Sequence, residues 1–277
     1  MSGAFLGSPM AELSVVAALA TDPAARVMVL IDGQNLYKRC DDLFGHPLCH
    51  PHLLAQYLAG TRTRHPVACR FYTGRPNPNI RGEAEKTRNL DRRLHAMRQV
   101  GITVVFRPLR YHWEWGHRQA LPKPMRGLAG RRVTLHPWQR PREKGIDLVM
   151  ALDLIEFVLT GKCDVAIIVS LDRDLYEIPL ALQKLQPLIG RPVRLEAAVP
   201  VPDGLRFPKV LTGFHYTHQI TSGMFNRIRD DTDYTVPDAL WVPQRLPTTL
   251  PPASAPPQRI SSPPGTDSYS DVNADRS

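Results

Sequence analysis

The sequence lacks any long apolar run: no hydrophobic segment reaches the roughly 20 residues that a membrane-spanning helix requires. No Lys or Arg precedes the first apolar segment, Leu13–Ala20, so a secretory signal peptide is not expected. Only 4 cysteines occur in 277 residues and none forms a CxxC pair, which argues against a disulfide framework. We therefore expect a cytoplasmic protein without membrane partners.

Two common nucleotide-binding motifs are also missing. No GxGxxG follows the first apolar run, and no GxxxxGK[ST] loop occurs, so a dinucleotide-binding fold and a P-loop fit this sequence less well. Zinc-binding residue types do cluster at Cys40, His46, Cys49, His50 and His52. Because their spacing matches no common zinc module, we interpret them as ordinary loop and helix residues.

Positive charge is what the sequence has in excess. The formal net charge is +9 at pH 7, which favours an anionic partner such as nucleic acid. Residues 107–144 contain ten Lys or Arg, two acidic residues and several aromatics. Arginines bind phosphates and aromatic rings stack on unpaired bases, so we expect this basic insertion to contact RNA, with Arg131 and Arg132 among the binding residues. The alternative is a solvated surface flap.

Short apolar runs alternate with helical patterns along the chain. Strands are predicted at residues 26–31, 67–73, 102–106, 165–169 and 193–198, and helices at 35–44, 52–58, 83–100, 146–159 and 175–185. Residues 214–229 suit a last strand and helix. This alternation predicts an α/β domain with a mainly parallel sheet. The helix over 175–185 is possible only if Pro179 lies in its first turn.

Three regions follow from these patterns: an N-terminal extension at 1–25, a domain at 26–229 that carries the basic insertion, and a tail at 230–277. The tail is rich in Pro and Ser and has few apolar side chains, so we expect it to be disordered. A protein partner bound through the tail and a homodimer both stay open.

Acidic residues recur where apolar elements begin or end. Asp32 follows the first strand in "LIDGQN", Asp172 and Asp174 follow the strand at 165–169, and Asp147 opens an apolar helix. The carboxyl ends of parallel strands meet at one edge, where ligands bind, so we expect these side chains to lie together. Crowded carboxylates repel unless a cation neutralises them, and oxygen ligands suit Mg²⁺ or Mn²⁺.

Each of these residues also has an ordinary structural interpretation. An Asp before Gly is common in turns, as at Asp32. Asp147 could be a helix N-cap or simply favour the positive end of the helix dipole. The pair Asp172 and Asp174 could form a solvated turn that starts the next helix.

Three segments, "VMVLIDGQNLY", "KGIDLVMALDLIEF" and "CDVAIIVSLDRDLYEIPLAL", resemble the signature segments of NYN domains, which are relatives of the PIN-like nucleases. The resemblance runs from Val27 to Val199. It implies a PIN-like α/β/α sandwich and a Mg²⁺- or Mn²⁺-dependent endoribonuclease. By position, the catalytic and metal-binding acids of the family fall on Asp32, Asp147 and Asp172, with Asp174 as a fourth.

Further positions carry over from the same resemblance. Asn35 would orient Asp32 or contact a phosphate, Lys144 would hold a phosphate, and Ser170 would hydrogen-bond a carboxylate or a water. Asp153 does not share a helical face with Asp147, so we assign it a structural role. Many relatives have Gly where this chain has Leu171. A non-catalytic RNA- or protein-binding regulatory module is therefore the alternative function.

Overall fold

A six-stranded parallel sheet forms the centre of the protein, with the strand order β3-β2-β1-β6-β7-β8. The structure is a computed structural model that describes residues 9–60, 62–80, 82–115, 137–204 and 211–236. All five strand pairs of this sheet are parallel. The strands are β1 (Val27–Asp32), β2 (Pro66–Arg75), β3 (Thr103–Pro108), β6 (Val165–Val169), β7 (Arg194–Pro200) and β8 (Tyr216–Ile220).

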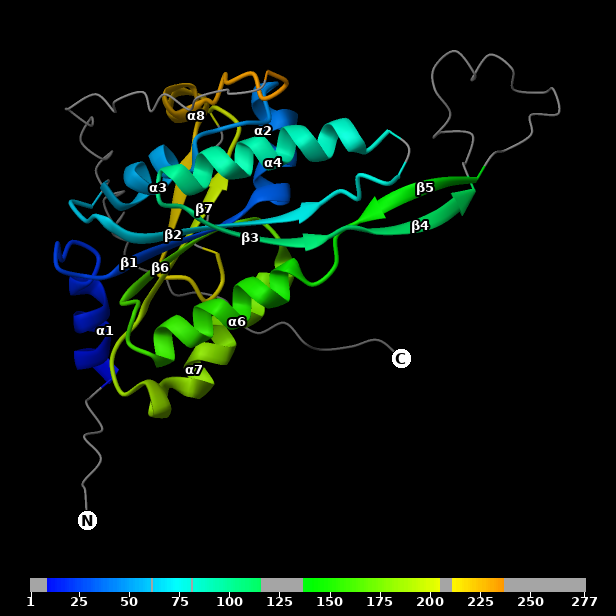
Figure 1. Cartoon of the computed structure of the whole chain (residues 1–277). Helices are drawn as coiled ribbons and strands as arrows, with labels where there is room; N and C mark the ends of the chain where they lie inside the picture. Colours follow the sequence, from blue (N-terminus) through cyan, green and yellow to red (C-terminus); the bar gives the residue numbers. More distant parts are fainter. Residues whose placement is uncertain (1–8, 61, 81, 116–136, 205–210, 237–277) are drawn as a thin grey trace, which may run out of the picture.

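Helices cover both faces of the sheet (Figure 1). Helices α2, α3, α4 and α8 lie on one face, and α6 and α7 lie on the other. This layering confirms the predicted α/β/α sandwich. The helices are α1 (Pro9–Ala18), α2 (Gly33–Phe44), α3 (Pro51–Gly60), α4 (Ala84–Gln99), α6 (Ile146–Leu159), α7 (Glu177–Ile189) and α8 (Ser222–Ile228), with a 3₁₀ helix, η2 (Arg173–Tyr176), before α7.

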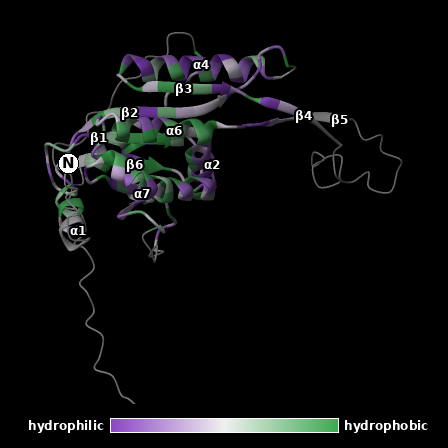
Figure 2. Cartoon of the chain, turned by 90° about the horizontal axis from the view of Figure 1, so that it is seen from below, coloured by the Kyte–Doolittle hydropathy of each residue, from purple (hydrophilic) through white to green (hydrophobic). Residues whose placement is uncertain are grey.

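The two central strands explain why the sequence contains continuous apolar runs. Every residue of β1 and β6 is buried, as expected for strands covered on both faces. Alternate residues of β1 enter opposite cores: Val29 packs with α2 and α3, whereas Leu30 packs with α6 and α7. Figure 2 shows hydrophobic residues gathered in the middle of the molecule around the sheet.

Helix α7 begins at Glu177, so Pro179 lies in its first turn, as predicted. The first turn tolerates proline because its backbone N–H groups have no partner within the helix. The predicted last strand and helix are also present, as β8 and α8.

The basic insertion contains two strands that the sequence analysis did not anticipate. Strands β4 (Arg110–Trp115) and β5 (Pro137–Arg142) pair in antiparallel register and project beyond the ends of β2 and β3 (Figure 1). We call this pair the basic hairpin. The pairing of β4 with β5 joins residues more than 20 positions apart, so no short-range sequence pattern predicts it. Arg131 and Arg132 lie outside the described residues, between the two strands.

Some chain beyond the predicted domain boundaries is ordered against the sheet. Asp230 and Tyr234 are buried, and the Tyr234 hydroxyl donates to Asp230 Oδ2 at 2.8 Å. The Pro- and Ser-rich residues that follow position 236 lie outside the described part of the chain. Within the described residues, no helix has the length and apolar character needed to cross a membrane.

Candidate functional site

Asp32 ends β1 and starts α2. Its side chain accepts hydrogen bonds from the backbone N–H of Asn35 at 3.0 Å and from Ser170 Oγ at 2.9 Å. It is therefore the N-cap of α2, and it is 4% exposed. A Cβ added at Gly33 would lie 2.4 Å from the Phe71 ring, so only glycine lets α2 start so close to β2. This close packing explains the "DG" pair.

The loop after β6 is tied to the same helix. Ser170 Oγ accepts from the backbone N–H of Asp172 at 3.1 Å, and the backbone N–H of Leu171 donates to Asn35 Oδ1 at 3.0 Å. Asp172 in turn caps η2 by accepting from the backbone N–H of Asp174 at 3.0 Å. The Asn35 side chain thus positions the loop, while its backbone positions Asp32.

Leucine at position 171 causes no backbone strain. Among the described residues other than glycine, Thr63 alone has a positive φ, so Leu171 adopts an ordinary conformation. The backbone of this chain therefore does not require a glycine at position 171.

Asp147 enters the site from α6. The N-cap of this helix is Gly145, which has the left-handed φ of 83° that glycine tolerates. Asp147 lies in the first turn, where the helix dipole favours a negative charge, so the N-cap interpretation of Asp147 was wrong. Lys144, just before this glycine, is exposed. Asp153 lies farther along α6, where it binds Arg70 and the Tyr72 hydroxyl.

The electrostatics show that the predicted aspartates share one environment. Burial raises the pKa of Asp147 to about 6, with further contributions from the charges of Asp32, Asp172 and Asp174. Burial also raises the pKa of Asp32, and the charge of Asp172 adds to that effect. The structure therefore gathers the four predicted carboxylates at the carboxyl edge of the sheet.

A fifth carboxylate, which the sequence analysis missed, belongs to the same environment. Burial and, to a lesser extent, the charges of Asp32 and Asp147 together raise the pKa of Glu143 to about 7. Glu143 follows β5 and precedes Lys144, so in the sequence it was counted only as one of two acids in a basic segment. Its position directly before "KGID" was the one available signal.

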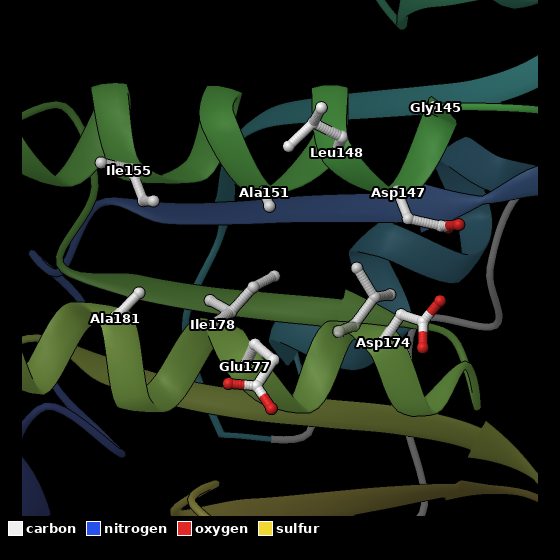
Figure 3. Close-up of a pocket in the computed structure, with 10 residues that line it drawn as sticks. Gly145, Asp147, Leu148, Ala151, Ile155, Asp174, Glu177, Ile178 and Ala181 are labelled. Carbon is white, nitrogen blue, oxygen red and sulfur yellow. The ribbon is translucent and has the colours of Figure 1, made fainter.

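The acidic edge opens into a groove between α6 and α7. Asp147 and Asp174 stand at one end of this groove, and apolar side chains such as Ile155 and Ile178 line the rest (Figure 3). The groove has a volume of about 390 Å³. The candidate site is thus reached from a concave surface of a size that suits ligand binding.

The donor set fits a hard divalent cation, because it consists of carboxylates that raise one another's pKa. In the described conformation, however, no group of three or more His, Cys, Asp or Glu residues is arranged to hold a metal ion. Asp32 and Asp172 hydrogen-bond to neighbouring groups of the protein instead. The zinc-binding residue types near Cys40 form no such group among the described residues either, and Cys40 and Cys49 pack in the hydrophobic core.

The metal-free protein should be destabilised by its own carboxylates at neutral pH. Because the folded pKa of Asp147 lies above the unfolded value of about 3.9, ionisation costs stability as pH rises towards and past about 6. An Asp147→Asn variant should therefore melt above wild type at pH 7.5 in EDTA, and this gap should close near pH 4. Thermal denaturation across pH 4–8 tests this, with the exposed Asp42→Asn as control; a gap independent of pH would contradict it.

Comparison with known proteins places the chain in a family. The NYN domain profile matches residues 26–187. A search of curated proteins found no significant match. Among solved structures, the chain is similar to a protein of unknown function from Vibrio parahaemolyticus, at 18% identity and a TM-score of 0.43, over 72% of this chain and 94% of that one. On the strength of the profile match over more than half its length, the chain belongs to the NYN domain family of PIN-like nucleases.

Proposed function

We propose that this protein is a Mg²⁺- or Mn²⁺-dependent endoribonuclease that hydrolyses RNA phosphodiester bonds at the acidic edge of the sheet. One observation carries the proposal: Asp147, at the start of α6, lies in the field of three aspartates from two other segments, and burial together with the charges of Asp32, Asp172 and Asp174 raises its pKa. Membership of a family of PIN-like nucleases supports it. Perturbed carboxylates in a concave site are typical of functional positions.

We assign each residue of the site a role in this proposed mechanism. Asp32, Asp147, Asp172 and Asp174 would hold the cation. A bound divalent cation would supply charge neutralisation at the phosphodiester and activation of the attacking water. Ser170 and the backbone of Asn35 keep the Asp32 carboxylate in one orientation through their hydrogen bonds. The exposed ammonium of Lys144 would contact a substrate phosphate beside these acids.

The basic hairpin supports RNA as the substrate class. Arg107 and Arg110 are exposed at its base, and Arg110 is paired in register with Arg142. The Tyr111 hydroxyl accepts from the backbone N–H of Asn77 at 3.0 Å, which fastens this base to the body of the protein. Because β5 leads directly into Glu143 and Lys144, phosphates bound along the hairpin would be guided towards the acidic edge.

Cleavage of a circular single-stranded RNA would test the proposal, because only an endonuclease can open it. Purified protein with Mn²⁺ should convert the circle to linear fragments, EDTA should stop the reaction, and excess Mn²⁺ should restore it. Removal of the metal should stop cleavage because carboxylates alone cannot neutralise the negative charge of the phosphodiester. Linear products that persist in EDTA would contradict the metal-dependent mechanism.

A non-catalytic RNA- or protein-binding module is the second candidate. One observation favours it: no group of three or more His, Cys, Asp or Glu among the described residues is arranged to hold a metal. Leu171, where the resemblance to NYN domains implies a glycine, is a second reason. RNA binding that survives EDTA, without cleavage under Mg²⁺ or Mn²⁺, would support this function. Absence of any RNA binding would count against the nuclease and against an RNA-binding module, and would favour a module that binds a protein partner.

A further inference from the structure

The Glu143 carboxylate lies at the end of β2, between the hairpin and the acidic edge. The backbone N–H of Gly74 hydrogen-bonds to this carboxylate. A Cβ added at Gly74 would lie 2.9 Å from Glu143 Oε2 and 2.7 Å from Gln34 Nε2, so the glycine leaves the room that the carboxylate occupies. Close packing at Gly74 therefore holds Glu143 against the edge that Asp32 and Asp147 share.

One oxygen of this half-buried carboxylate has no hydrogen-bond partner. Among the side-chain atoms that the structure describes, Glu143 Oε2 is buried and has no hydrogen-bond partner. Leaving a buried acceptor unsatisfied costs roughly 1–3 kcal/mol, and more when the acceptor is charged. A buried polar atom without a hydrogen-bond partner is rare in native proteins, and one explanation is an ion or water that binds there.

Glu196 shows what a glutamate that serves the fold looks like in this protein. Both of its oxygens are bonded, with Arg64 Nη2 at 2.7 Å, Arg194 Nε at 2.6 Å and His218 Nε2 at 2.8 Å. Within the described part of the chain, no cation is shown bonded to the Glu143 carboxylate, and the charges that shift its pKa are those of Asp32 and Asp147. A purely structural role therefore does not account for Glu143.

We propose that Glu143, presented by the end of β5, is a fifth acidic residue of the site and that its unpaired Oε2 binds the same divalent cation, directly or through one water. The inference rests on the proposed metal site. It assigns the basic hairpin a second role, because the strand that would guide RNA also delivers a ligand. Binding of RNA to β5 would then shift or fix the position of the Glu143 carboxylate.

Mn²⁺ titration of Glu143→Gln, followed by the electron paramagnetic resonance of free Mn²⁺, tests this without measuring activity. We expect at least about a 10-fold weaker affinity, as is typical when a group that supports a metal site is lost. The thermal midpoint in EDTA should equal or exceed that of wild type, because the variant removes a crowded charge. Glu143→Asp, which keeps the charge, should recover part of the affinity.

Glu83→Gln is the matched control, since Glu83 is largely buried near the hairpin but binds Lys86. It should leave Mn²⁺ affinity unchanged. Unchanged affinity in Glu143→Gln would overturn the inference and leave the four-aspartate site standing. A lower midpoint in EDTA would also overturn it, because it would show that the charge stabilises the fold. If wild type itself binds no Mn²⁺, the proposed metal site fails as well.

Discussion

An Asp32→Asn/Asp172→Asn double variant is expected to lose RNA cleavage by at least about 1000-fold while it keeps its fold. Each substitution removes one negative charge from the proposed cation site, and a 1000-fold loss corresponds to about 4 kcal/mol of transition-state stabilisation. The asparagine carbonyl can still accept the hydrogen bond that Asp32 Oδ1 receives from the Asn35 backbone N–H. The amide NH2 then takes the place of Oδ2, so the Ser170 hydroxyl turns to accept instead of donate. Initial cleavage rates in Mn²⁺ and thermal midpoints measured on the same samples check both halves of the prediction.

The matched control is Asp41→Asn/Asp42→Asn, which changes two exposed aspartates of α2 and should leave the rate unchanged. RNA affinity of the active-site variant should stay near that of wild type, because the basic hairpin would carry most of the phosphate contacts. Equal cleavage by wild type and the active-site variant would contradict the nuclease proposal, because it would show that a contaminating enzyme cleaves the RNA.

Replacing Glu196 by Gln is expected to lower the free energy of unfolding by about 3–5 kcal/mol, the usual cost of removing one partner from a buried ion pair. Glu196 and Arg64 are fully buried and Arg194 nearly so, and both arginines bind Glu196. The isosteric amide leaves their two positive charges without a counter-charge. For a domain of this size the thermal midpoint should fall by about 10 °C.

The pH dependence of this loss has a definite sign. Burial alone would raise the pKa of Glu196, but its hydrogen bonds with His218 and Arg64 hold it well below the usual range. Its contribution to stability is therefore complete above the unfolded pKa of about 4.3 and shrinks as pH falls towards the folded value. Adding Arg64→Met to Glu196→Gln should restore part of the midpoint. The exposed Glu156→Gln should change it little, and a similarly small change for Glu196→Gln would contradict the prediction.

Local patterns were enough to predict an α/β domain with a mainly parallel sheet, whereas the α/β/α layering was implied by the resemblance to NYN domains. The apolar runs that became β1 and β6 are buried along their whole length, so their composition alone identifies them as central parallel strands. Pro179 limited where α7 could begin. The basic hairpin could not be predicted in this way, because each of its strands depends on a partner distant in the sequence.

The sequence by itself determined that aspartates would follow β1 and β6 and stand at the start of α6, since those elements are defined by local apolar patterns. Only the tertiary structure decided which acids share one environment. Glu143 joined them although its neighbours in the sequence are basic, and Asp153 instead became a partner of Arg70 and Tyr72. Burial and the field of nearby charges depend on distance through space, which the order of residues along the chain does not specify.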